Sequence, residues 1–282
     1  MSTLLIAGPL ALDDFPEAPG MLGGAGGYAA MAAAPLATTQ LWARGGRDIS
    51  TQVRGILEQR HIDLAGVGWD GATPRGEEAN GSFLPATEPT SADNVGAVLV
   101  IGLPPDDWRR AVRVARALPG GESRTLIAAP RAMDLSDPAL RRELCAHADV
   151  LVVSLPTAQV ATNTSDPLAA SRALQEDGAK CVVLTAGMLG GFIAYRQKAT
   201  TYPSLPVPTV EGTGIGPSFA GALAAWCAGA GKDDFRALKR GCAVASAVAC
   251  ICAQGPGPKK LLGADRKEYL ERFNRLRRAG KS

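Results

Sequence analysis

Residues 210–226, VEGTGIGPSFAGALAAW, decide how the rest of the sequence is interpreted. Three alternating glycines precede an alanine-rich apolar run with the composition of a helix. Glycine lets the backbone turn tightly and point its amides to one side. A helix from about residue 217 would direct its positive end at the same point. We expect an anion hole made by Gly214, Ile215 and Gly216, and the alternative is a glycine-rich turn that binds no ligand.

The bulk composition excludes several classes of protein. The chain has 282 residues, 46% of them hydrophobic, and a net charge of +3. This size suits one domain over residues 1–282, and the balanced charge gives no reason to expect a nucleic-acid partner. Apolar runs stay below the ~20 residues that a bilayer needs, and no leader sequence is visible. We therefore expect a cytoplasmic protein without a membrane partner.

The cysteines and histidines show no metal-binding pattern. The six cysteines include no C-x-x-C pair, and only two histidines accompany them. Cys250 and Cys252 would lie on different faces of an apolar helix over residues 242–253. We interpret them as buried small residues and predict no metal site of this kind.

Short apolar runs alternate with helical patterns along most of the chain. Val, Ile and Leu runs of this length are typical of strands buried on both faces of a sheet. Alternation at this spacing predicts βαβ units, a mostly parallel sheet and helices on both of its faces. The expected strands are residues 3–8, 39–46, 97–102, 125–130, 149–154 and 181–187. The expected helices are residues 28–36, 49–61, 105–118, 137–148 and 167–179.

Residues 66–92 interrupt this alternation. They are rich in Gly, Pro, Thr and Ser and contain GSFLPAT (81–87), which could form a short hairpin. This segment is consistent with two alternatives, a β-flap that covers a site and a surface loop without a function.

Five motifs in a fixed order resemble the ribokinase-type (PfkB) carbohydrate kinase family. Together they span nearly the whole chain. They are LLIAGPLALDDF (4–15), LGGAGGYAAMAAA (22–34), RHIDLAGV (60–67), CVVLTAGMLGGFI (181–193) and EGTGIGPSFAGAL (211–223). The apolar run 241–257 also stands where the family has its last adenine-side helices.

The resemblance implies a ribokinase-like three-layer α/β/α sandwich with a reduced β-lid. It also implies transfer of the γ-phosphate of ATP to an alcohol group of a sugar, a nucleoside or a similar acceptor. Carried over by motif, Asp13, Gly23, Gly24 and Tyr28 bind the acceptor, with Asp14 competing for the role of Asp13. The nucleotide would contact Thr185, Gly187 and Gly190.

The late glycine loop departs from the family at its most important position. The family pattern is D-x-T-G-A-G-D-x-F, and its last aspartate is the general base. Pro217 stands at that position, and proline neither accepts a proton nor offers an amide N–H. Ser218 is a poor base, and Glu211 lies six residues away. No catalytic residue is therefore assigned.

Two further departures affect the metal and the lid. Where the family often has N-x-x-E, this chain has Ser154 and Thr157 and no carboxylate, which disfavours Mg²⁺. The strand over 125–130 ends without an aspartate, and the lid segment looks short and is interrupted by proline.

Two functions are consistent with these residues. One is a pseudokinase that binds ATP, ADP, a sugar or a nucleoside and regulates a protein partner, or serves as a scaffold. The other is an active sugar or nucleoside kinase with a non-standard base. In this family the lids of two subunits often pair, so the resemblance leaves a homodimer as an alternative, although the short lid argues against it.

Overall fold

The computed structural model describes residues 2–15, 18–73, 82–89, 95–121, 124–230 and 234–279. Ten strands form one sheet in the order β12-β11-β10-β9-β8-β7-β1-β4-β5, with β6 paired to β4. All pairings from β10 to β5 and β6 are parallel, whereas β11 pairs antiparallel with both of its neighbours, β10 and β12. The strands are β1 Thr3–Ala7, β4 Thr38–Gly45, β5 Ile62–Asp63, β6 Val67–Trp69, β7 Val95–Ile101, β8 Thr125–Ala129, β9 Val150–Ser154, β10 Cys181–Thr185, β11 Gly191–Tyr195 and β12 Lys198–Tyr202.

The central strands are buried on both faces, as the sequence predicts. In β1, Leu4 and Ile6 pack into one hydrophobic core, and Leu5 and Ala7 pack into the other. The strands β7, β9 and β10 divide their side chains in the same alternating way. This period of two follows from the pleat of a strand, so each apolar run contributes to two cores.

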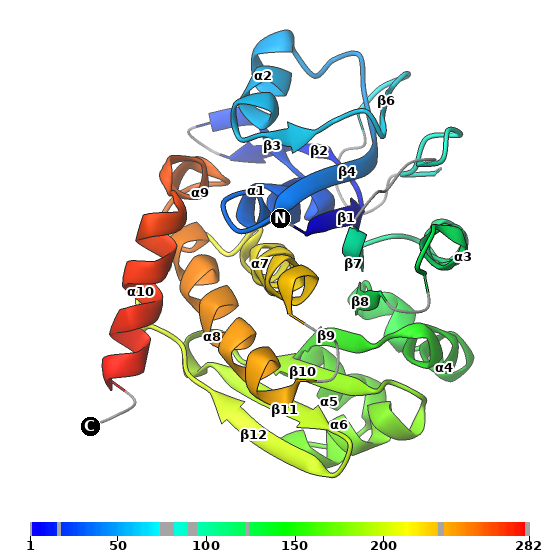
Figure 1. Ribbon diagram of the computed structural model, residues 1–282, viewed down its shortest axis with the longest axis vertical. Coiled ribbons are helices and arrows are strands. Elements are labelled where there is room, and N and C mark those ends of the chain that lie inside the picture. Colours follow the sequence, from blue (N-terminus) through cyan, green and yellow to red (C-terminus); the bar gives the residue numbers. More distant parts are fainter. Residues whose placement is uncertain are drawn as a thin grey trace.

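Helices cover both faces and make the three layers of the predicted α/β/α sandwich (Figure 1). The first core packs against α1 Ala25–Ala33, α2 Thr51–Gln59, α7 Ile215–Gly229, α8 Phe235–Cys252, α9 Lys259–Gly263 and α10 Arg266–Ala279. The second core packs against α3 Pro105–Ala117, α4 Pro138–His147, α5 Leu155–Thr162 and α6 Pro167–Glu176. Two short 3₁₀ turns, η1 Ala132–Leu135 and η2 Gly187–Leu189, follow β8 and β10.

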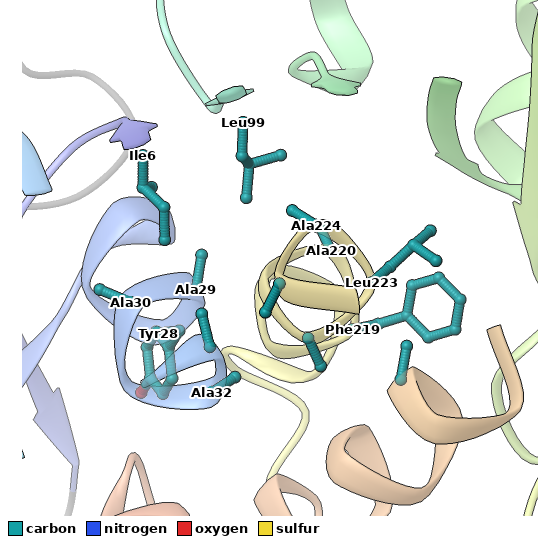
Figure 2. Packing of buried hydrophobic residues seen from close by; sticks show 14 of the residues in the cluster. Ile6, Tyr28, Ala29, Ala30, Ala32, Leu99, Phe219, Ala220, Leu223 and Ala224 are labelled. Atoms are coloured by element: carbon teal, nitrogen blue, oxygen red, sulfur yellow. The ribbon is translucent and has the colours of Figure 1, made fainter. Parts of the chain in front are cut away.

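The helices α1 and α7 approach each other closely because small residues meet between them. A side chain at Gly221 of α7 would collide with the backbone of Ala29 in α1. Figure 2 shows the two helices side by side, with Ala29 and Ala32 on the side of α1 nearer to α7, below Ile6 and Leu99. The close approach brings the beginnings of both helices to one edge of the sheet.

A separate two-stranded antiparallel sheet precedes α1. It consists of β2 Ala11–Phe15 and β3 Ala18–Gly23. Asp13 therefore lies on β2, a strand that is not among those expected from the sequence. No strand occurs in residues 82–89, so the described part of GSFLPAT does not form the hairpin considered from the sequence. Residues 74–81 and 90–94, which belong to the same segment, lie outside the described residues.

The segment 82–89 is fixed to the body of the protein. The buried carboxylate of Asp107 in α3 accepts hydrogen bonds from Ser82 Oγ and Phe83 N, both at 2.5 Å. Trp42 Nε1 donates to the carbonyl oxygen of Thr87 at 3.1 Å. These contacts hold Phe83 against the carboxyl end of the sheet. Within the described part of the chain, no helix is long and apolar enough to cross a membrane.

Candidate ligand and phosphate site

A cavity of about 740 Å³ lies at the carboxyl ends of the central parallel strands. In sheets of this kind, ligands bind where the strand order reverses, and here the reversal occurs at β1, between β4 and β7. The lining combines the ends of four strands with the first turns of α1 and α7. Its polar and loop residues are Asp13, Gly24, Tyr28, Gly102, Arg131, Ser154, Thr157, Thr185, Thr213, Gly214, Gly216 and Pro217. Its apolar residues include Pro9, Ala11, Phe83, Ile101, Met133, Val153 and Ala220.

Asp13 is placed in the cavity by the hairpin β2–β3. Its carboxyl group occupies the space where a side chain at Gly23 would lie, which explains the glycine at that position. Burial raises the pKa of Asp13, while the Tyr28 hydroxyl and the Gly24 amide partly oppose this effect. Asp13 Oδ2 is buried and has no hydrogen-bond partner among the described residues. Asp14 is exposed, and its carboxylate accepts from Gly20 N at 2.7 Å.

Tyr28 connects the hairpin to the glycine loop. It is 1% exposed, and its ring lies against Gly214. Burial, and next the charge of Asp13, raise the pKa of Tyr28. Although the two groups influence each other's pKa, Tyr28 Oη makes no well-formed hydrogen bond with a described residue. Asp13 Oδ2 and Tyr28 Oη are thus both buried and lack partners within the described residues, an arrangement that costs free energy without a ligand.

Gly24 is required at the start of α1. Its φ is 77°, and a side chain there would approach the carbonyl oxygen of Pro9 to 2.6 Å. Gly23 does not line the cavity but leaves room for Asp13, so the glycine pair shapes the site.

The late glycine loop is ordered by its own acidic residue. Glu211 Oε1 accepts from Gly212 N at 2.7 Å, and from Thr213 N and Thr213 Oγ1 at 3.0 Å each. The amides of Thr213 and Gly212 lower the pKa of the half-buried Glu211. Gly214, at φ 81°, then begins α7.

The next amides of the loop differ in their surroundings, and Ile215 N donates to the carbonyl oxygen of Gly212 at 3.4 Å. No described group accepts from Gly214 N or Gly216 N, and the first bond of the helix runs from Ser218 N to Gly214 O at 2.9 Å. A side chain at Gly216 would meet nothing within 4 Å. The amides at the positive end of α7 can therefore receive an anion. Ile215, also predicted for the hole, does not line the cavity.

Pro217 lies in the first turn of α7 and lines the cavity. A proline is tolerated there because the first turn of a helix has no intrahelical partner for its amides. Ser218 does not compensate, since it is fully buried outside the cavity, where its hydroxyl lowers the burial-raised pKa of Cys252.

Hydroxyl groups line the cavity at the carboxyl ends of β9 and β10. Ser154 Oγ caps α5 by accepting from Thr157 N at 3.2 Å, and lies 2.7 Å from Thr157 Oγ1. Thr185, at the end of β10, joins them in the lining, whereas Gly187 and Gly190 do not. Gly190 instead shapes the turn into β11, with φ 85° and its carbonyl accepting from Ala186 N at 2.8 Å.

Phe83 and Arg131 are among the cavity residues that were not expected from the sequence. Phe83 belongs to the segment interpreted only as a flap or excursion. Arg131 follows β8, which we had described only by its missing aspartate. Its guanidinium forms a two-point ion pair with the buried Asp134, with Nε–Oδ2 at 2.8 Å and Nη2–Oδ1 at 2.7 Å. The sequence signal that could have identified this pair is the i, i+3 spacing of opposite charges.

The described lining is a poor match to a magnesium site. Asp13 is its one carboxylate and stands on β2, while the hydroxyl-rich end presents Ser154, Thr157 and Thr185. No group of three acidic, histidine or cysteine side chains in the described residues could hold a metal ion. Mg²⁺ is usually bound through one or two carboxylates together with substrate phosphates.

A model of the pfkB family of carbohydrate kinases matches residues 94–255, more than half of the chain, and the chain belongs to this family. No curated protein is significantly similar in sequence.

Solved kinase structures share the whole fold. A fructokinase from Vibrio cholerae O395, bound to fructose, ADP and calcium, is 18% identical, with 97% of this chain and 99% of that chain covered and a TM-score of 0.78. A ribokinase from Cryptococcus neoformans var. grubii serotype A in complex with ADP is 19% identical, with 96% and 99% covered and a TM-score of 0.75. An aminoimidazole riboside kinase from Salmonella enterica, complexed with aminoimidazole riboside and an ATP analogue, is 14% identical, with 96% and 100% covered and a TM-score of 0.77. At these identities the likeness establishes a ribokinase-like fold with a mostly parallel sheet.

Proposed function

We propose that this PfkB-family protein binds a small alcohol ligand and a nucleotide, and that it has lost efficient phosphoryl transfer. The observation that carries the proposal is Pro217, which lines the cavity where the family pattern places its base. A positioned base contributes about 10²–10⁴ in rate. The other described groups near the loop are hydroxyls, and Glu211 is engaged by the loop's own amides.

The geometry supports retained binding. The amides of Gly214 and Gly216 have no acceptor in the described part of the chain, and a side chain at Gly216 would meet open space. At the other end, Asp13 Oδ2 and Tyr28 Oη are buried and have no hydrogen-bond partner among the described residues. A ligand hydroxyl between them would remove both deficits, because it can donate to the carboxylate and accept from the phenol.

The ligand classes follow from the fold neighbours. The Vibrio fructokinase was solved with fructose and ADP, and a Burkholderia thailandensis nucleoside kinase with inosine. We propose that this chain takes a sugar or nucleoside near Asp13 and ADP or ATP along Gly214, Gly216 and Thr185. Its regulatory output would pass to a protein partner that distinguishes the bound from the free state. We further propose that residues 1–282 act as one domain.

An alternative is a working kinase in which Asp13 replaces the missing base. Asp13 lines the same cavity as the anion loop, and burial raises its pKa, which makes it a stronger base than an exposed aspartate. Its Oδ2 has no hydrogen-bond partner among the described residues.

A turnover assay separates the two functions. Purified protein is incubated with ATP, Mg²⁺ and a panel of sugars and nucleosides, and ADP release is followed, with calorimetric titration of ADP in parallel. We expect ADP binding without turnover. A rate of about 1 s⁻¹ or more on any acceptor would overturn the pseudokinase and favour the alternative.

A further inference from the structure

We infer that the nucleotide phosphates are bound without a divalent metal, and that the guanidinium of Arg131 supplies the positive charge. The inference rests on the proposed nucleotide binding and adds the means of charge compensation. Among the described lining residues, Arg131 is the one cationic side chain.

The first argument is the position of the carboxylates. Asp13, the one described carboxylate in the lining, lies on β2 beside Tyr28 rather than at the end formed by β9 and β10. Asp134 is the acidic residue that accompanies Arg131, but it is buried, does not line the cavity, and uses both oxygens to accept from the guanidinium. Among the described residues, a magnesium ion at that end would find hydroxyl groups and no carboxylate.

The second argument is the fixed position of Arg131. Its side chain is 24% exposed, and the two-point contact with Asp134 restricts its rotation. A guanidinium carries five N–H donors in a planar fork that matches phosphate geometry. Two donors serve Asp134, and the side chain still contributes to the cavity wall. Because the Arg131 side chain is already restricted before binding, less of its conformational entropy is lost when a ligand binds.

The third argument is where this charge lies in the fold. Arg131 follows β8, which lies between β7 and β9 in the sheet, and the ends of all three strands line the cavity together with Gly214 and Gly216. The amides of the loop and the positive end of α7 form one binding point for an anion. The guanidinium of Arg131 forms a second binding point in the same cavity. A diphosphate or triphosphate could therefore be held at two points without a metal.

The test is calorimetric titration of the full chain with ADP and ATP, in EDTA and in excess Mg²⁺. We expect binding in EDTA, and no tighter binding in excess Mg²⁺, because the described lining has no carboxylate at the end formed by β9 and β10 to hold the ion. Arg131→Gln should weaken ADP binding by at least about tenfold, the usual range for a charge-assisted hydrogen bond. Adenosine, which lacks phosphates, should bind the native protein and the variant equally.

A second variant guards against misfolding. Arg131→Gln leaves the buried Asp134 without its partner, so the double variant Arg131→Gln/Asp134→Asn replaces the ion pair by a neutral pair. It should melt near the native protein and still show the loss of ADP affinity. Arg131→Lys keeps the charge without the fork and should fall between the two.

The outcomes separate the inference from the proposed function. Binding that appears only with Mg²⁺ overturns the inference and leaves nucleotide binding intact. Metal-independent binding that survives in the double variant overturns the role of Arg131. Absence of ADP and ATP binding in both buffers overturns nucleotide binding itself.

Discussion

The ring of Tyr28 occupies the space that a side chain at Gly214 would need. Tyr28 belongs to α1, at the proposed acceptor end of the cavity, and Gly214 caps α7, at the proposed phosphate end. The two halves of the site therefore share one wall. A substitution at either residue should displace the other, because the interior is close-packed and leaves no empty space between them.

Gly214→Ala should destabilise the protein by about 2–4 kcal/mol. The residue has a φ of 81°, which is strained for alanine, and its new methyl group would overlap the buried ring of Tyr28. Strain and overpacking each contribute about 1–3 kcal/mol. Chemical denaturation followed by circular dichroism measures the loss. An unchanged unfolding midpoint would show that Tyr28 moves aside freely.

Gly216→Ala is the matched control and should leave the unfolding free energy within about 1 kcal/mol of the native value. Its methyl group would meet nothing within 4 Å and point into open space. Because that space is the proposed anion site, ADP affinity should fall although the fold is kept. Native ADP affinity in this variant would place the anion elsewhere.

Asp13→Asn should raise the melting temperature at pH 7 by about 1–3 °C while weakening acceptor binding. Burial raises the folded-state pKa of Asp13 above 3.8, so the folded protein binds more protons than the unfolded chain between 3.8 and that raised value. The unfolding free energy therefore falls as pH rises through this window. Asp13→Asn does not titrate, so its unfolding free energy does not fall in this way. Its higher melting temperature relative to the native protein should therefore disappear below pH 3.8, which thermal scans at several pH values test.

Glu211→Ala should weaken ADP binding by about three- to tenfold, although it removes a negative charge near an anion site. The carboxylate holds the amides of Gly212 and Thr213, so its loss releases the loop that presents the open amides. Its pKa is lowered from 4.5, so the contact is complete above pH 4.5 and disappears as pH falls through the folded-state value. Glu211→Gln should be intermediate, and tighter binding in the alanine variant would mean that charge outweighs loop order.

Pro217→Asp should raise turnover on an accepted sugar or nucleoside by at least about 10²-fold. An aspartate in the first turn of α7 adds a base to the cavity and interacts favourably with the helix end. Pro217→Asn is the control, since it has the same shape without the base. If aspartate and asparagine behave alike, the loss of chemistry extends beyond residue 217.

Much of the fold could be predicted from the sequence because the central strands are short, apolar and bounded by turns. The expected strand over 181–187 corresponds to β10, and the expected helix over 167–179 corresponds to α6, with ends displaced by a few residues. The edge strand β12, KATTY, was missed because only its last residue is buried, so it carries no apolar run. The helix α5 was missed because Ser154 ends β9 and caps the helix at once.

By itself, the sequence determined the two-sided sheet and the family, because apolar periodicity and motif order are properties of the linear chain. Only the tertiary structure decided that Asp13 rather than Asp14 lines the cavity, that Tyr28 packs on Gly214, and that Arg131 shares the cavity with the glycine loop. Residues 13, 131 and 214 belong to separate segments that meet where the parallel strands end. Which of their side chains point inward depends on hairpin register and helix packing, and neither is a local property of the sequence.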